Sequence, residues 1–356
     1  METVLVKGTI KLADVAKAAG VSQGTASNVF NRPEVVREEV REHVLATASQ
    51  LGYAGPSLTG RLLRAGKVNA IGVAAVEPLA YFFDDPWARA LLAAVAQVCD
   101  ASGTGLALVS AKDRQKLDWN IKNALVDGFI LLCVEGGEKL VRLTRERQLP
   151  FIALALNGYD PSIRSISVDN IRGAATAATH LAELGHRRFA VLATEFVNDR
   201  VGPVGIGEVE RAIYSTSRDR AIGYWQALEP FGIQRQDVPI YETNNDKASV
   251  ETCLEHLFSV QEPPTAILAM SDNIAMLAMT WLAARGLAVP EDVSVIGFDG
   301  VPEGGMVEPG LTTMAQPFAE IAQSAVRAVI EDATPIEREM IDVTLVVRGS
   351  TAAPKI

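Results

Sequence analysis

The sequence has few cysteines and no long hydrophobic run. Cys99, Cys133 and Cys253 lie far apart without a CxxC pair, and an odd count argues against a disulfide scaffold or a structural zinc site. No stretch of about twenty uncharged apolar residues occurs, and the N-terminus has no basic segment followed by an apolar run. We therefore predict a cytoplasmic protein with no membrane partner.

Catalytic motifs are also missing. The four histidines (His43, His180, His186 and His256) have no metal-ligand spacing, and neither a GxSxG nor a GxGxxG motif is present. The glycines of segment 194–217 lack the spacing of a phosphate loop. These absences predict a protein that is not an enzyme and that binds no metal and no cofactor.

Charge is unevenly distributed along the chain. The net charge is −10, yet residues 1–67 contain nine Lys/Arg and six Asp/Glu, which leaves −13 for the remainder. A mildly basic N-terminal region on an acidic body is typical of polyanion binding by one domain. The alternative is chance, because the excess is only three charges.

The 356 residues exceed one ordinary core and predict two or three domains. From residue 68 onward, apolar β-type runs alternate with amphipathic helical patterns, most of them closed by glycine. This alternation predicts parallel sheets covered on both faces, with functional residues at the carboxyl ends of the strands. The β-type runs are 70–76, 105–110, 128–134, 150–156, 188–193, 265–270 and 293–298.

Residues 1–67 contain only helical patterns. An apolar stripe through Leu12, Val15, Ala16 and Ala19 ends at Gly20, and a second stripe follows Ser22, a good N-cap. A third helical pattern runs to Gly52, so the segment is predicted to be a helix-turn-helix domain.

The second of these helices is predicted to present polar side chains outward. Gln23, Gly24, Ser27 and Asn28 remain once the core face is assigned, and Gln and Asn pair bidentately with adenine. This face is expected to enter a DNA major groove and to favour A·T-rich half-sites. Binding of a protein by the three helices is the alternative.

Several separated segments resemble the lactose-repressor/galactose-repressor (LacI/GalR) family of bacterial transcription regulators. The similarity implies an all-α helix-turn-helix head and an α/β two-lobed core like type I periplasmic binding proteins. Its segments are TIKLADVAKAAGVSQGTASNVFN, REHVLATASQLGYAGPSLTGRLLR, HLAELGHRR, SDNIAMLAM, VPEDVSVIGFDG, LTTMAQP and LVVRGST.

The resemblance implies three parts of the chain. These are a DNA-binding domain (9–55), a hinge helix with linker (56–67) and a core for effector binding and dimerisation (68–356). Within the core, an N-lobe is expected at about 68–166 and 300–326, and a C-lobe at about 167–298 and 330–350.

The same resemblance implies DNA contacts. Base contacts are expected at Gln23, Gly24 and Asn28, and phosphate contacts at Ser22, Thr25, Ser27 and Asn31. A hinge helix would insert into the minor groove through Leu63, with Leu62 and Arg61 beside it, whereas a plain linker is the alternative.

An effector cleft is expected between the lobes. Asp299 follows a predicted strand and matches the family's effector aspartate, or else it only begins an Asp-Gly turn. Arg220 matches the family arginine that grips the ligand, with a solvated arginine as the alternative. The further expected effector-binding residues are Phe83, Asp85, Trp87, Asp169, Tyr214, Thr216 and Ser271, while Asp272 is either a ligand contact or a helix cap.

Together these features predict a homodimeric repressor that binds double-stranded operator DNA and responds to a small molecule, expected to be a sugar. A stand-alone solute receptor of periplasmic type is the alternative, although it has no use for residues 9–64.

Overall fold

The computed structural model describes residues 10–55, 67–113, 115–132, 137–155, 162–197, 200–331 and 338–355. The chain divides into two compact units, Met1–Val68 and Asn69–Ile356, which we call the head and the core. The predicted hinge residues Arg61, Leu62 and Leu63 lie outside the described residues. Within the described ranges, no helix is long and apolar enough to cross a bilayer.

The head is a small helical domain, as the sequence predicts. Its core consists of short side chains, including Val15, Ala26 and Val44, because the helices approach one another closely. Gly20 (φ 63°) and Gly52 (φ 72°) end two helices in the left-handed conformation that favours glycine. The elements are α1 (Leu12–Ala18), α2 (Gln23–Asn31), the 3₁₀ turn η1 (Pro33–Val35) and α3 (Glu38–Leu51).

The first lobe of the core is built on a six-stranded, all-parallel sheet. In order, its strands are β12 (Arg338–Ile341), β5 (Ser165–Val168), β4 (Phe151–Leu154), β3 (Gly128–Leu132), β1 (Ala70–Ala75) and β2 (Gly105–Ser110). The lobe's helices are α5 (Tyr81–Asp84), α6 (Pro86–Ser102), α7 (Leu117–Asn123), α8 (Glu138–Glu146) and α14 (Phe318–Ile330).

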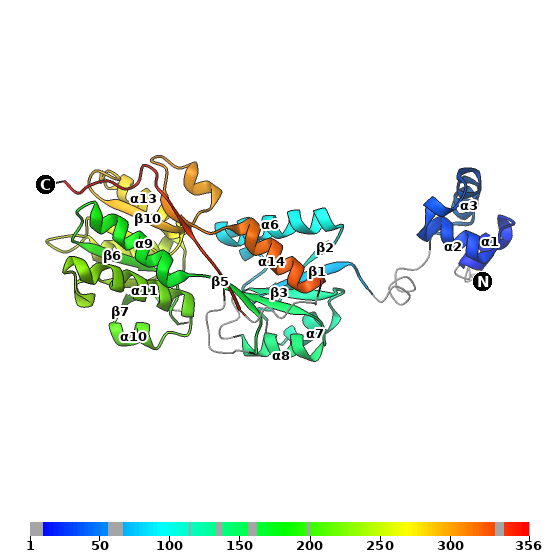
Figure 1. Ribbon diagram of the computed structural model, residues 1–356, viewed down its shortest axis with the longest axis horizontal. Coiled ribbons are helices and arrows are strands. Elements are labelled where there is room, and N and C mark those ends of the chain that lie inside the picture. Colours follow the sequence, from blue (N-terminus) through cyan, green and yellow to red (C-terminus); the bar gives the residue numbers. More distant parts are fainter. Residues whose placement is uncertain are drawn as a thin grey trace, which may run out of the picture. The chain divides into compact units, whose positions relative to one another are not determined.

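Helices cover both faces of this sheet, with α6 and α14 on one and α7 and α8 on the other (Figure 1). This arrangement explains why its strands are continuous apolar runs.

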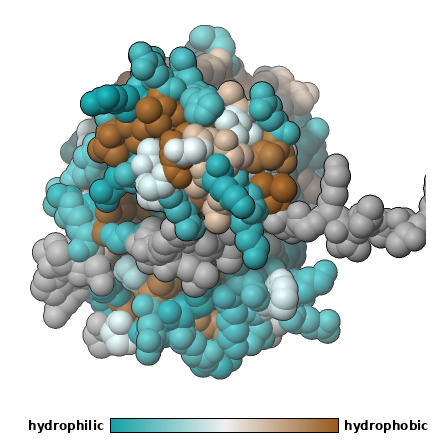
Figure 2. Space-filling view, turned by 90° about the vertical axis from the view of Figure 1, so that its right-hand side faces the viewer, coloured by the Kyte–Doolittle hydropathy of each residue, from teal (hydrophilic) through white to brown (hydrophobic). Residues whose placement is uncertain are grey.

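Figure 2 shows one face of the molecule, where hydrophilic residues predominate and hydrophobic residues form separate groups between them.

The second lobe is built on a seven-stranded sheet. In order, its strands are β13 (Thr344–Val346), β11 (Thr312–Ala315), β10 (Ser294–Asp299), β9 (Ala266–Ala269), β6 (Phe189–Ala193), β8 (Ile240–Glu242) and β7 (Gly202–Val204), of which β7 and β13 are antiparallel to their neighbours. Its helices are α9 (Asn170–Glu183), α10 (Ile206–Glu210), α11 (Ser215–Leu228), α12 (Lys247–Leu257) and α13 (Asp272–Ala284), with the 3₁₀ turns η2 (Glu229–Phe231), η3 (Arg235–Asp237) and η4 (Pro302–Gly305).

The predicted lobe boundaries are wrong in two places. Residues 300–326 were expected in the N-lobe, but β11, which lies in this range, pairs with β10 in the second sheet. Strand β12 was expected in the C-lobe, but it pairs with β5 in the first sheet. The chain therefore passes between lobes at 168–170, 315–318 and 341–344, since strand pairing decides which lobe a short segment joins.

Candidate functional site

The start of α2 is fixed by a local cap. The Ser22 hydroxyl accepts a hydrogen bond from the Thr25 amide at 3.0 Å and lies 2.9 Å from the Thr25 hydroxyl. Ala26 and Val29 on the opposite side are buried in the core of the head. The cap and this buried side hold the first turn of α2 with Gln23 and Gly24 exposed to solvent.

The outward face of α2 contains the residues expected to contact DNA. Gln23, Gly24 and Asn28 are exposed, so their positions are open to a partner. The Asn31 amide donates to the Ser27 carbonyl at 2.9 Å and to the Ser27 hydroxyl at 3.1 Å. The side chains of Ser27 and Asn31 therefore already support the helix, whereas Gln23 and Asn28 project from an exposed edge.

A cavity of about 430 Å³ lies in the core, lined by residues that follow strands of both sheets. This is where a parallel α/β architecture places its ligands. Seven of the residues expected from the sequence line it: Asp85, Trp87, Tyr214, Thr216, Arg220, Ser271 and Asp299.

The remaining two expected residues do not line the cavity. Phe83, on the short helix α5, is 60% exposed and is not among the lining residues. Asp169 is the N-cap of α9, where it accepts from the Arg172 amide at 2.9 Å and pairs with the Arg172 side chain. Its carboxylate is therefore used by its own helix, and neither Phe83 nor Asp169 is part of the cavity lining.

Arg220 is buried in α11 rather than solvated. Its Nε donates to the Asn170 Oδ1 at 2.8 Å, and an Nη donates to the Met270 carbonyl. The guanidinium carbon lies 3.7 Å from the centroid of the Phe298 ring. Burial lowers the pKa of Arg220, and the nearby Asp299 carboxylate opposes that shift. The guanidinium is thus held rigidly at the cavity wall.

Asp299 ends β10 with a positive φ of 145°, a conformation that an L-residue keeps only when its surroundings enforce it. Its Oδ1 accepts from the Gln316 amide at 2.8 Å, and its Oδ2 accepts from the Asp272 backbone at 3.3 Å. Burial raises the pKa of Asp299 well above its ordinary value, although Arg220 pulls it down. Asp299 both lines the cavity and begins the turn at Gly300.

Asp272 is a structural residue. It is fully buried and accepts hydrogen bonds from the amides of Gly300 (2.7 Å) and Val301 (2.8 Å) and from the Thr313 hydroxyl (2.5 Å). The cap of α13 is Ser271, whose hydroxyl accepts from the Ile274 amide. Asp272 therefore holds the backbone that carries Asp299.

The first turn of α6 contributes a polar and an aromatic group from the first lobe. Asp85 caps α6 by accepting from the Ala88 amide at 2.9 Å, and it also accepts from the Asn245 amide of the second lobe at 2.8 Å. The Trp87 indole donates to the Gln316 side chain at 3.1 Å. Burial raises the pKa of Asp85. The cleft is thus spanned by direct contacts.

Further lining residues escaped the sequence analysis, including Tyr81, Asn170, Thr194, Glu195, Asn245 and Gln316. Thr194 and Asn245 follow β6 and β8, so the rule that ligands sit beyond strand ends was a usable signal for them. Gln316 follows β11, which the sequence analysis did not recognise as a strand.

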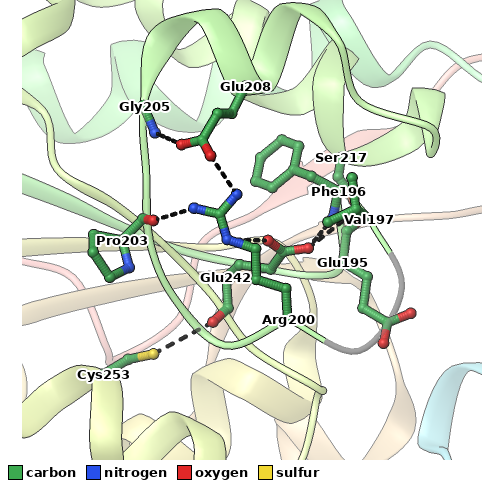
Figure 3. Close-up of polar contacts among 10 residues, drawn as sticks. All are labelled: Glu195, Phe196, Val197, Arg200, Pro203, Gly205, Glu208, Ser217, Glu242 and Cys253. Atoms are coloured by element: carbon green, nitrogen blue, oxygen red, sulfur yellow. Dashed lines mark hydrogen bonds and ion pairs between the residues drawn. The ribbon is translucent and has the colours of Figure 1, made fainter.

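The segment after β6 contains β7 and α10 and is tied to β8 by a charged cluster (Figure 3). Buried Glu242 accepts from the amides of Phe196 (2.5 Å) and Val197 (2.9 Å). Arg200 lies between Glu242, 3.7 Å away, and Glu208, 2.6 Å away.

The cluster also shapes the cavity wall. The Arg200 hydrogen bond is the largest influence that lowers the pKa of Glu208, to about 2. The Ser217 hydroxyl donates to the Glu195 carbonyl at 2.7 Å and lies 2.8 Å from the Thr194 hydroxyl. Glu242 therefore fixes the backbone next to two cavity residues, Thr194 and Glu195.

Comparisons with known proteins match parts of both the head and the core. Residues 11–55 match the family described as "Bacterial regulatory proteins, lacI family", and residues 178–351 match the "Periplasmic binding protein-like domain". An HTH-type transcriptional regulator of Mycobacterium tuberculosis is 34% identical over 351 residues, covering 96% of this chain and 97% of the relative.

Two solved structures have the same fold along almost the whole chain. The lac repressor bound to ONPG in the repressed state is 25% identical, covers 97% of this chain and 100% of its own, and has a TM-score of 0.76. The complex of the transcriptional regulator CelR with cellobiose is 25% identical, covers 96% and 99%, and has a TM-score of 0.67.

Proposed function

Because the chain belongs to the LacI family of bacterial regulatory proteins, we propose that this DNA-binding transcriptional regulator is a homodimeric repressor controlled by a small polyhydroxy effector. The effector occupies the cavity between the lobes and changes the affinity for a symmetric operator. The observation that carries the proposal is one chain with an exposed polar recognition helix and a polar cavity in a separate unit.

The head supplies the chemistry of DNA reading. Gln23 is exposed at the start of α2, the end of a recognition helix that contacts base edges, and Asn28 is exposed farther along the same helix. We propose that both side chains read adenine and that Gly24 lets the backbone approach the groove closely. Ser22, Thr25, Ser27 and Asn31 would lie beside phosphates.

The cavity supplies the chemistry of polyol binding. Arg220 and Asp299 present a guanidinium and a carboxyl group, each able to hold two neighbouring hydroxyls. Trp87 adds an aromatic face that packs on the apolar side of a sugar ring. The related CelR structure contains cellobiose, which supports the same ligand class here.

A surface groove supports self-association. Met276, Met279 and Val307 line it, and neighbouring Met306 is 80% exposed. Flexible methionine side chains on a surface suit a protein interface. Two chains would then bring two recognition helices to the two halves of a palindrome.

The test is selection of bound duplexes from a random library by the full chain, followed by titration with and without sugars. We expect an inverted repeat whose affinity changes at least about five-fold with one of them. The double variant Gln23→Ala/Asn28→Ala should lose sequence preference while the sugar still raises its unfolding temperature. No preference for symmetric over scrambled duplex contradicts the proposal.

A further inference from the structure

The cavity is lined by more negative than positive side chains. Its carboxyl groups come from both lobes. The described lining residues include one cation, Arg220, and five carboxyl groups, those of Glu77, Asp84, Asp85, Glu195 and Asp299.

The single cation is already engaged. Arg220 is 5% exposed, its guanidinium is bound to Asn170 and the Met270 carbonyl, and one face of the guanidinium stacks on Phe298. Recognition of a phosphate or carboxylate requires donors that can converge on it. Arg220 therefore presents only its remaining edge to a ligand, and the Asp299 carboxyl group interacts with it electrostatically.

The carboxyl groups penalise a further negative charge. Burial raises the pKa values of Asp85 and Asp299, which means that negative charge is already disfavoured at these positions. Glu77 and Glu195 are half-buried and Asp84 is exposed. An anionic ligand would meet several like charges in a partly desolvated space, where they act more strongly than in water.

We infer that the cavity selects its effector by charge, admitting polyhydroxy compounds that are uncharged or carry an ammonium group and rejecting phosphorylated or carboxylated ones. The inference rests on the proposed function and names the ligand class of the same site. Hydroxyl and amide side chains such as Ser271, Asn244 and Asn245 bind hydroxyl groups without needing ligand charge.

The test uses matched ligands that differ in charge. Dissociation constants are measured from shifts in the unfolding temperature of the full chain. The sets are D-glucose, D-glucosamine, D-gluconate and D-glucose 6-phosphate; D-ribose and D-ribose 5-phosphate; and cellobiose and cellobionate. For each set that binds, we expect the anion to bind about 30-fold or more weakly than the neutral or ammonium compound.

A charge-neutralised variant sharpens the test. The triple variant Glu77→Gln/Asp84→Asn/Glu195→Gln should reduce the difference in dissociation constant between the neutral and the anionic ligand of each set. The matched control Glu138→Gln/Glu229→Gln/Glu291→Gln removes the same charge from exposed sites that do not line the cavity, and the difference should remain. Should the triple variant not fold, the single substitution of exposed Asp84 by Asn tests the same effect.

The outcomes separate the two claims. An anion that binds as tightly as its neutral counterpart, or a difference unchanged by neutralisation, overturns charge selection and leaves the cavity as the effector site. Failure of every compound to shift the unfolding temperature, in the wild type and in the neutralised variant, counts against a polyhydroxy effector and overturns both claims.

Discussion

The head and the core use polar residues in opposite ways. In the head, Gln23 and Asn28 are exposed on a helix whose other side packs into a small apolar core. In the core, Arg220, Asp272 and Asp299 are buried and bonded to the protein itself.

This difference separates recognition from stability. Exposed side chains are replaced with little effect on folding, so loss of DNA reading should leave the head intact. Buried charged groups contribute to the fold and to the site together, so their replacement should damage both.

The largest effect is expected for Arg220→Ala. The substitution removes two buried hydrogen bonds, the stacking on Phe298 and the positive charge that acts on Asp299, and we expect the free energy of unfolding of the core to fall by about 3–5 kcal/mol. Urea unfolding measures this change, and any effector that the screen identifies should no longer raise the unfolding temperature. Arg218→Ala is the control, because Arg218 pairs only with neighbouring Asp219 among the ion pairs described and should cost about 1 kcal/mol or less. Equal losses of unfolding free energy in the two variants would contradict the contrast between buried and exposed charged residues.

Glu242→Gln is expected to come next. Glutamine keeps an oxygen for the Phe196 and Val197 amides, but it loses the charge facing Arg200 and buries an NH₂ group beside it. We expect a loss of about 1–3 kcal/mol and faster hydrogen exchange at those two amides. The control Glu262→Gln, at an exposed position, should change stability by less than about 0.5 kcal/mol. Unchanged exchange in Glu242→Gln would show that the cluster does not fix this segment.

Asn28→Ala tests the head. Loss of a bidentate contact to adenine should cost about 1–3 kcal/mol in binding to the selected operator, with little change in thermal stability. Competition against random DNA measures the specific part. An equal loss on both DNAs would show that Asn28 touches phosphate rather than a base.

The smallest effect concerns pH. His186 is buried, with its Nδ1 2.9 Å from the Thr265 hydroxyl and its Nε2 2.8 Å from the Ala352 carbonyl. Burial lowers the pKa of His186 below 6.5, so at pH values just under 6.5 the unfolded chain binds a proton that the folded chain does not. Stability should therefore fall as the pH drops through this window, by at most about 1.4 kcal/mol per unit.

The variant His186→Gln isolates this contribution from the carboxyl groups of the core. Its stability should depend less on pH between 7 and 5.5 than that of the wild type. Exposed His256→Gln should keep the wild-type slope. Parallel slopes for all three proteins would contradict the assignment.

Sequence periodicity was sufficient to predict most of the regular secondary structure. The head helices and the seven apolar strands were predicted because each packs a continuous stripe or run, and local rules decide such elements. The predicted N-cap Ser22 and the terminating Gly20 are confirmed for the same reason. Short strands such as β11 and β12 were missed, since partners far away in the chain define them.

The candidate site was partly predictable. Arg220 and Asp299 follow from the resemblance, and their place in the cavity follows from strand order. Phe83 and Asp169 were expected in the cavity lining, but residues next to them in the chain, such as Asp84 and Asn170, line it instead. Strand order predicts which loop reaches the cavity but not which side chain of that loop does. Glu242 was missed because its role depends on amides 45 and 46 residues away, which no local pattern encodes.

The three short passages between the lobes have a mechanical consequence. Each spans only a few residues, at 168–170, 315–318 and 341–344. Parallel tethers of this kind permit the lobes to swing about a common axis and resist sliding or separation. If the proposed effector binds in the cavity, we expect it to change mainly one quantity, the angle between the two lobes.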